Sequence, residues 1–177
     1  FSGKEKEYVN DAVVSEWVST GGSKVGDFEK AIADYVHMDR AVACNCGSSG
    51  LHLAMLISGV GAGDEVIVPT LTFIAAVNPV RYANAEPVFI GCDDSLCMDP
   101  AAAEECHMED GKLINNTSGR HVKALLVVHV FGNMADMVEF TRIAKECNLI
   151  LIEDATEALG TYYTSGPFAG KYAGTIG

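Results

Sequence analysis

The chain has 177 residues, enough for one domain with a substantial core. Its net charge of −12, from 24 acidic and 12 basic residues, argues against nucleic acid or an anionic membrane surface as a partner. No apolar run is long enough to span a bilayer, because charged pairs such as Asp64-Glu65 and Asp93-Asp94 interrupt the sequence.

The first 40 residues predict two amphipathic helices. Apolar residues recur at helical spacing within 3–18, so a first helix should end near Trp17. A second helix over 26–35 should bury Phe28 and Ile32. We expect residues 1–40 to form an N-terminal helical segment.

Strands and helices alternate from residue 41 onward. Strand-like runs occur at 41–45, 65–68, 87–90, 123–130 and 149–152, and helix-like runs at 51–58, 75–83, 100–106 and 137–147. Apolar strands separated by helices predict a three-layer α/β/α domain around a mostly parallel sheet. The polar stretch 108–120 is expected to be a surface hairpin or loop. Residues 41–177 are therefore expected to be part of one large α/β domain.

The six cysteines form no CxxC pair, and no histidines are arranged near them. Cys44 and Cys46 would alternate along a strand, which does not suit a zinc site. We therefore expect no metal, and a cytoplasmic protein whose thiols are reduced and mostly buried. Because the chain begins at Phe1 and no closing element follows the last strand signal before Gly177, we expect a piece of a longer protein.

The turn Gly47-Ser48-Ser49 is a candidate anion site. No Asp, Glu, Lys or Arg lies between Ala41 and Gly63, so backbone N–H groups, serine hydroxyls and a helix N-terminus would have to hold the anion. A buried strand-turn-helix that uses glycine only to turn is the alternative. Neither a Gly-x-Gly-x-x-Gly pattern nor a Walker lysine is present, which argues against those nucleotide sites.

Other candidate residues follow the predicted strands, where parallel sheets hold their ligands. Asp154 ends a buried strand, where a carboxylate is costly unless it meets a cation. The alternative is a solvated or metal-binding aspartate that caps the next helix. Glu157 could face the same site or lie on the surface. Phe73 could stack on a flat ligand or pack in the core, and His129 suits a structural role better than catalysis.

Five ordered motifs resemble the DegT/DnrJ/EryC1/StrS nucleotide-sugar aminotransferases, which use pyridoxal 5'-phosphate on the type I aminotransferase fold. They are Cys46-Gly-Ser-Ser-Gly-Leu-His-Leu-Ala54, Gly63-Asp-Glu-Val-Ile-Val-Pro-Thr-Leu-Thr-Phe-Ile-Ala75, Pro87-Val-Phe-Ile90, Val128-His-Val-Phe-Gly-Asn133 and Ile152-Glu-Asp-Ala-Thr-Glu-Ala-Leu-Gly160. Within the family, Thr20-Gly21, the insertion from Gly111 to Arg120 and the acid at Glu157 resemble the branch that aminates UDP-4-keto-6-deoxy-N-acetylhexosamines.

The resemblance implies a role for each candidate residue. Gly47, Ser48 and Ser49 would hold the cofactor phosphate, and Phe73 would stack on the pyridine ring. Asp154 would pair with the protonated ring nitrogen and so keep the ring an electron sink. Glu157 would lie near the ring hydroxyl. His129 would belong to the site wall, with no proton-transfer role that the residues themselves indicate.

The resemblance also implies a Schiff-base lysine, which in this family follows the region matching Gly174-Thr-Ile-Gly177. No lysine of this chain has the matching sequence context. We therefore expect an N-terminal part of a pyridoxal phosphate-binding large domain that is inactive alone. The parent enzyme would transfer an amino group from glutamate to a 4-keto nucleotide sugar, as a homodimer. A dehydratase with histidine at the lysine position and a non-catalytic binding or regulatory protein are the alternatives.

Overall fold

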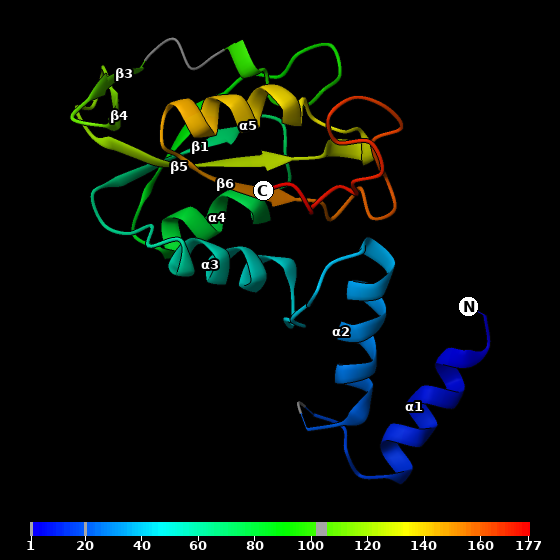
Figure 1. Ribbon diagram of the computed structural model, residues 1–177. Helices are drawn as coiled ribbons and strands as arrows, with labels where there is room; N and C mark the ends of the chain where they lie inside the picture. The colour runs from blue at the N-terminus through cyan, green and yellow to red at the C-terminus, as the bar shows by residue number, and fades with distance from the viewer. Residues whose placement is uncertain (1, 20, 102–105) are drawn as a thin grey trace. The chain divides into compact units, whose positions relative to one another are not determined.

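The computed structural model describes residues 2–19, 21–101 and 106–177 (Figure 1). The chain forms two compact units, residues 1–44 and residues 45–177. No helix among the described residues is long and apolar enough to cross a membrane.

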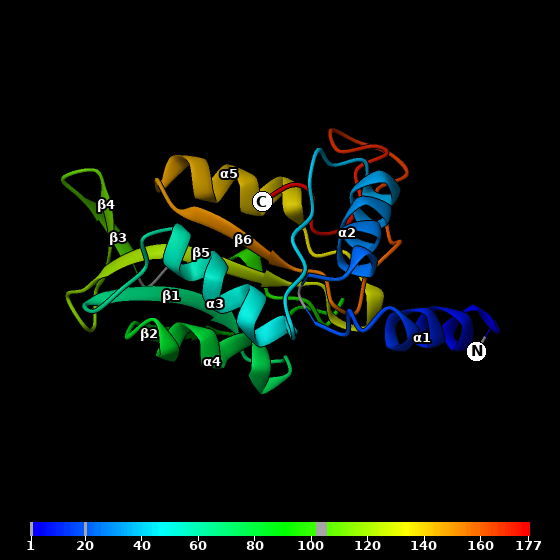
Figure 2. The same ribbon diagram turned by 90° about the horizontal axis from the view of Figure 1, so that it is seen from below.

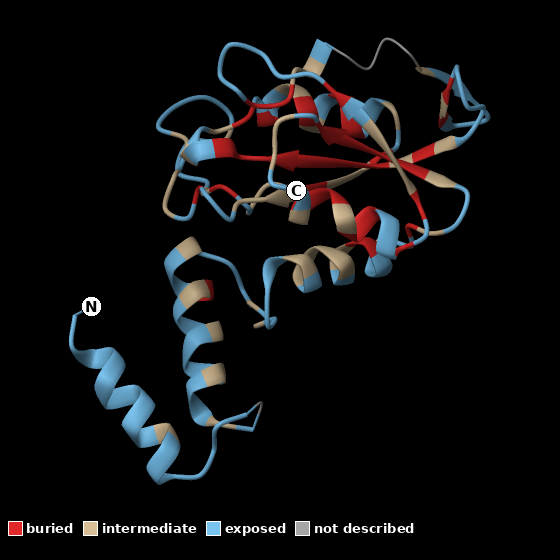
Figure 3. Cartoon of the chain, turned by 180° about the vertical axis from the view of Figure 1, so that it is seen from behind, coloured by how far each residue is buried: buried red, intermediate tan, exposed pale blue. Residues whose placement is uncertain are grey.

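The first unit contains helices α1 (Lys4–Val14) and α2 (Ser23–Val36). Ala33 is its one buried hydrophobic residue among those described, and Phe28 remains 58% exposed, so the predicted burial of Phe28 is wrong. The first helix also ends before Trp17, where Glu16 adopts a left-handed φ of 61°. Two helices without a further layer cannot enclose a core, and most of this unit is exposed in Figure 3.

The second unit consists of strands and helices that alternate. They are α3 (Gly47–Ile57), β1 (Asp64–Pro69), α4 (Ile74–Tyr82), β2 (Glu86–Ile90), β3 (Cys106–Glu109), β4 (Lys112–Asn115), β5 (His121–Val128), the short 3-10 helix η2 (Val130–Gly132), α5 (Met137–Glu146) and β6 (Ile150–Asp154). The predicted strands and helices from residue 65 onward are present with small shifts at their ends, except for the run at 100–106.

The sheet has the order β2-β1-β5-β4-β3, and β6 also pairs with β5. Strands β2, β1, β5 and β6 are parallel, whereas β3 and β4 form an antiparallel hairpin whose second strand pairs with the start of β5. The polar stretch 108–120 therefore contains a hairpin turn, as predicted. Because the four parallel strands share a direction, their carboxyl ends lie at one edge of the sheet.

Helices cover both faces of this sheet, with α3 and α4 on one face and α5 on the other (Figure 1, Figure 2). Successive residues of β1 and β5 alternate between two cores, because strand side chains have a period of two. Val66 and Leu126 pack with Met55 of α3, whereas Ile67 packs with Phe140 of α5. The predicted three-layer α/β/α class is confirmed.

Two predictions around residue 44 are wrong. Residues 41–45 form no strand, and the Ala43 N–H instead donates to the side chain of Glu29 at 2.8 Å. Because residues 41–45 pair with no strand of the sheet, the sheet does not bury them. Cys44 and Cys46 are therefore exposed rather than buried. Cys92 is exposed as well, and only Cys97 of the six is buried. None of the six cysteines, all of which are described, forms a disulfide.

The predicted helix at 100–106 falls largely on residues 102–105, which lie outside the described residues. Cys106, its expected last residue, begins strand β3 instead. Cys106 pairs with Asn115 of β4 across the hairpin. Helical spacing in the sequence cannot reveal such a strand pairing.

Candidate active site

A cavity of about 600 Å³ lies at the carboxyl ends of β1, β5 and β6. In the sheet, β1 has β2 as its neighbour on one side, and β5, on its other side, also pairs with β6. The chain therefore continues from β1 and from β5 in opposite directions across the sheet, and the strand order reverses between these two strands. Open α/β sheets bind ligands at such a point. The cavity is lined by Cys46, Gly47, Ser48, Leu51, Leu71, Thr72, Phe73, Ala75, Ala76, Val128, Val130, Phe131, Asp154, Thr156 and Glu157.

The N-terminus of α3 forms one wall of the cavity. The helix begins at Gly47, four residues earlier than predicted, with Cys46 extended before it and providing no side-chain cap. The first N–H groups of a helix have no intrahelical partner and favour an anion. At Gly47 an added Cβ would approach Thr156 Oγ1 only at 3.8 Å, so this end of the helix is open to the cavity.

Asp154 and Phe73 line the same cavity from two strand ends. Both hydrogen bonds to the Asp154 side chain among the described residues come from Thr156 and reach Oδ1, at 3.0 Å from N–H and 2.7 Å from the hydroxyl. Oδ2 therefore stays available to a cation. The Phe73 ring is 75% exposed, so it is not the core residue that the alternative described.

Glu157 reaches the cavity through a contact that the sequence did not indicate. Its Oε2 accepts a hydrogen bond of 2.6 Å from the N–H of Phe131. Phe131 has a left-handed φ of 56°, which is uncommon for a bulky residue, and its ring is 70% exposed at the cavity. The carboxylate thus holds a strained backbone segment in place.

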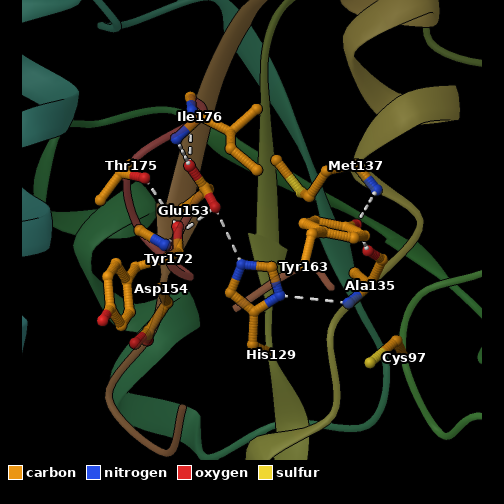
Figure 4. Close-up of polar contacts among 12 residues, drawn as sticks. Cys97, His129, Ala135, Met137, Glu153, Asp154, Tyr163, Tyr172, Thr175 and Ile176 are labelled. Atoms are coloured by element: carbon orange, nitrogen blue, oxygen red, sulfur yellow. Dashed lines mark hydrogen bonds and ion pairs between the residues drawn. The ribbon is translucent and has the colours of Figure 1, made fainter. Parts of the chain in front are cut away.

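Two predicted site residues do not line the cavity. Ser49 lies on the first turn of α3, and its hydroxyl is 3.3 Å from the Cys46 Sγ, an interaction that lowers the pKa of the Cys46 thiol. His129 is fully buried behind the wall. Its Nδ1 accepts a hydrogen bond of 3.2 Å from the Ala135 N–H, and its Nε2 lies 2.9 Å from Glu153 Oε2 (Figure 4).

Glu153 is the partner that sequence reasoning missed. Its side chain is 3% exposed and receives hydrogen bonds from His129 and from the backbone N–H groups of Gly174, Ile176 and Gly177. Burial raises the pKa of this carboxyl, but the bonds from His129 and the three N–H groups outweigh burial, so the pKa lies below its ordinary value of 4.5.

Thr156 and Phe131 were not singled out from the sequence either. Both lie within two residues of Asp154 or His129, just after the ends of β6 and β5, so this position was the available signal. Nothing local in the sequence marked Glu153, because its partners come from segments far away in the chain.

The residues around the cavity fit a flat, phosphorylated ligand with a cationic ring. The open N-terminus of α3 suits a phosphate, the exposed Phe73 ring suits an aromatic face, and Asp154 suits a cation. Among the described residues, no group of three or more His, Cys, Asp or Glu is placed to hold a metal ion.

Comparisons with known proteins agree with this chemistry. The family model of the DegT/DnrJ/EryC1/StrS aminotransferases matches residues 2–177. GDP-perosamine synthase from Escherichia coli O157:H7 is 41% identical over 177 residues, which are 99% of this chain and 44% of that protein. This chain thus spans less than half of that relative.

Two solved structures share the fold. The aminotransferase from Psychrobacter cryohalolentis matches with a TM-score of 0.77 and 29% identity, over 89% of this chain and 38% of that one. NtdA from Bacillus subtilis, solved with bound cofactor PMP, matches with a TM-score of 0.75 and 27% identity, over 96% of this chain and 37% of that one.

The lowered pKa of Glu153 predicts how stability depends on pH. Because the folded-state pKa lies below 4.5, ionised Glu153 stabilises the fold above that pH, and this contribution is lost as the pH falls through the folded-state pKa. Urea unfolding at a series of acidic pH values should show a shallower loss of stability in Glu153→Gln than in the unmodified chain. The exposed control Glu109→Gln should keep the original slope, and an unchanged slope in Glu153→Gln would contradict the assignment.

Proposed function

Because this chain belongs to the DegT/DnrJ/EryC1/StrS aminotransferase family, we propose that its cavity is the pyridoxal 5'-phosphate site of a nucleotide-sugar aminotransferase. The whole protein, acting in the cytoplasm as a homodimer, would move an amino group from glutamate to a 4-keto nucleotide sugar. The observation that supports this most is that three features line one cavity. They are the open N-terminus of α3, the exposed Phe73 ring and the Asp154 carboxylate, of which only Oδ1 accepts hydrogen bonds from described residues.

Each wall of the cavity would hold one part of the cofactor. The N–H groups at Gly47 and Ser48 would bind the phosphate, and the Phe73 ring would stack on the pyridine. Asp154 Oδ2 would accept from the protonated ring nitrogen while Thr156 holds Oδ1. Glu157 would lie near the ring hydroxyl while its Oε2 fixes Phe131. When bound, the cofactor supplies an electron-withdrawing ring that stabilises negative charge on the substrate carbon.

The amino group that attaches the cofactor covalently would come from outside residues 1–177. Among the described residues, no lysine lines the cavity. Lys171 lies in an exposed loop segment. We therefore propose that residues 1–177 supply the noncovalent half of the cofactor site.

Two nucleotide-sugar classes have support. The insertion 111–120, whose start lies in the β3–β4 hairpin, and the acid at Glu157 favour a UDP-linked 4-keto-6-deoxy-N-acetylhexosamine, by resemblance to that branch. The 41% identity to GDP-perosamine synthase favours a GDP-linked sugar as the second candidate.

Replacing Asp154 tests the cofactor site. Asp154→Asn keeps the shape and the acceptor for Thr156 but removes the charge that favours a protonated ring nitrogen, so affinity for pyridoxal 5'-phosphate should fall about tenfold or more. Titration followed by amide chemical shifts measures it. The control Asp136→Asn should bind like the unmodified chain, because Asp136 caps α5 outside the cavity and asparagine caps equally well. Equal affinity of the two variants would refute the assignment.

The proposal that residues 1–177 form no covalent link to the cofactor can be tested by absorbance. Mixing the 177-residue chain with pyridoxal 5'-phosphate should give no visible absorbance band that depends on one particular lysine. Substitution of each lysine in turn identifies any such band. A band abolished by a single substitution, such as Lys171→Arg, would show that this chain itself provides the attachment.

The sugar class is tested with the whole protein. Purified enzyme supplied with glutamate should aminate the UDP-linked 4-keto-6-deoxy-N-acetylhexosamine at a higher kcat/KM than the GDP-linked 4-keto-6-deoxyhexose, followed by formation of 2-oxoglutarate. The reverse order would favour the second candidate. No turnover with either sugar would count against the aminotransferase itself.

A further inference from the structure

Four hydrogen bonds converge on the buried carboxylate of Glu153. Oε2 accepts from His129 Nε2 at 2.9 Å and from the Gly174 N–H at 2.9 Å, and Oε1 accepts from the Ile176 N–H at 2.6 Å and from the Gly177 N–H (Figure 4). These donors come from His129, which directly follows β5, and from the segment 174–177. One side chain therefore joins three parts of the chain.

The histidine in this group is a fixed donor. His129 Nδ1 accepts from the Ala135 N–H, so its ring proton must be on Nε2, where it points at Glu153. Ala135 is fixed in turn, because its carbonyl accepts from the Tyr163 hydroxyl, which also accepts from the Met137 N–H. The tautomer of His129 is thus set by a chain of contacts that ends at the start of α5.

Only a carboxylate satisfies these four donors together. An ionised glutamate has two oxygens that accept and no proton to donate, whereas a glutamine amide would turn an NH₂ group toward at least one N–H donor. No Lys or Arg pairs with Glu153 among the described residues, so its charge is held by neutral donors alone. The residue type is therefore dictated by the geometry.

Glu153 and Asp154 are neighbours on β6, so their side chains leave the strand on opposite sides. Asp154 lines the cavity, while Glu153 is buried in the group just described. The backbone of Asp154 is tied to the same group, because its carbonyl accepts from the His129 N–H at 3.0 Å. The segment 174–177 also passes closely, since a Cβ added at Gly174 would lie 3.1 Å from the Ala155 Cβ.

We propose that Glu153 is a positioning residue of the cavity, which sets the direction of Asp154 by anchoring the end of β6 to His129 and to the segment 174–177. The part of this proposal that concerns the cofactor rests on the proposed function. Glu153 touches no ligand itself. It acts through Asp154, whereas the anion site at the N-terminus of α3 stands on separate contacts.

The test compares two isosteric variants of buried glutamates. Glu153→Gln places an amide among four donors. The control Glu65→Gln changes a glutamate that is 4% exposed at the start of β1, where Oε2 accepts from Asn115 at 2.8 Å and a glutamine oxygen can do the same. Both variants are studied below their unfolding temperatures, so that the folded state of each is compared.

Two readouts need no ligand. In Glu153→Gln, the amides of Gly174, Ile176 and Gly177 should exchange faster with solvent, and the His129 Nε2–H resonance should broaden or vanish. The Thr156 N–H, which bonds to Asp154 Oδ1, should also exchange faster if Asp154 loses its direction. Unchanged exchange at Thr156 would overturn the proposal, because Glu153 would then order only the segment 174–177.

A third readout separates ring binding from phosphate binding. Glu153→Gln should weaken pyridoxal 5'-phosphate about tenfold and inorganic phosphate less than about twofold, and Glu65→Gln should change neither. Equal weakening of both ligands would mean general loosening and would refute a role through Asp154. If the unmodified chain does not bind pyridoxal 5'-phosphate, the proposed function fails, and the Thr156 exchange alone decides the positioning role.

Discussion

The parallel alignment of β1, β5 and β6 is the constraint on which the site depends. Strand β5 pairs with β1 on one side and with β6 on the other, so their carboxyl ends meet at one edge of the sheet. Residues that are distant in sequence, such as Phe73 and Asp154, therefore line one cavity. The helices keep this alignment because α3 and α4 bury one face of the sheet and α5 buries the other.

The cavity has no cationic side chain among its described lining residues. Among the described residues its only charged lining groups are Asp154 and Glu157, and the chain as a whole carries a net charge of −12. A phosphate in this cavity would have to be held by the N–H groups and the dipole of α3, while the two carboxylates favour a ligand that is cationic elsewhere. This division of charge suits a protonated ring that bears a phosphate and disfavours a ligand with negative charge throughout.

Two adjacent acids of strand β6 lie in different environments, Asp154 at the cavity and Glu153 in the protein interior. Asp154 faces the cavity and has one oxygen free, whereas Glu153 has every oxygen engaged by neutral donors. A buried carboxylate without a cationic partner persists only when hydrogen bonds replace its lost hydration. Asp154 thus follows directly after an acid whose own position is fixed by hydrogen bonds from His129 and from the segment 174–177.

The sequence by itself determined the alternation of strands and helices after residue 64, apart from the run at 100–106. It also determined that Phe73, Asp154 and Glu157 lie at or just after strand ends, because apolar periodicity and chain order are local properties. Only the tertiary structure decided that residues 41–45 form no strand, that α3 begins at Gly47, and that His129 lies behind the cavity wall. The hydrogen bonds of Glu153 also depend on segments distant in the chain. Such contacts leave no local pattern, because a buried acid is stabilised by donors that only folding brings to it.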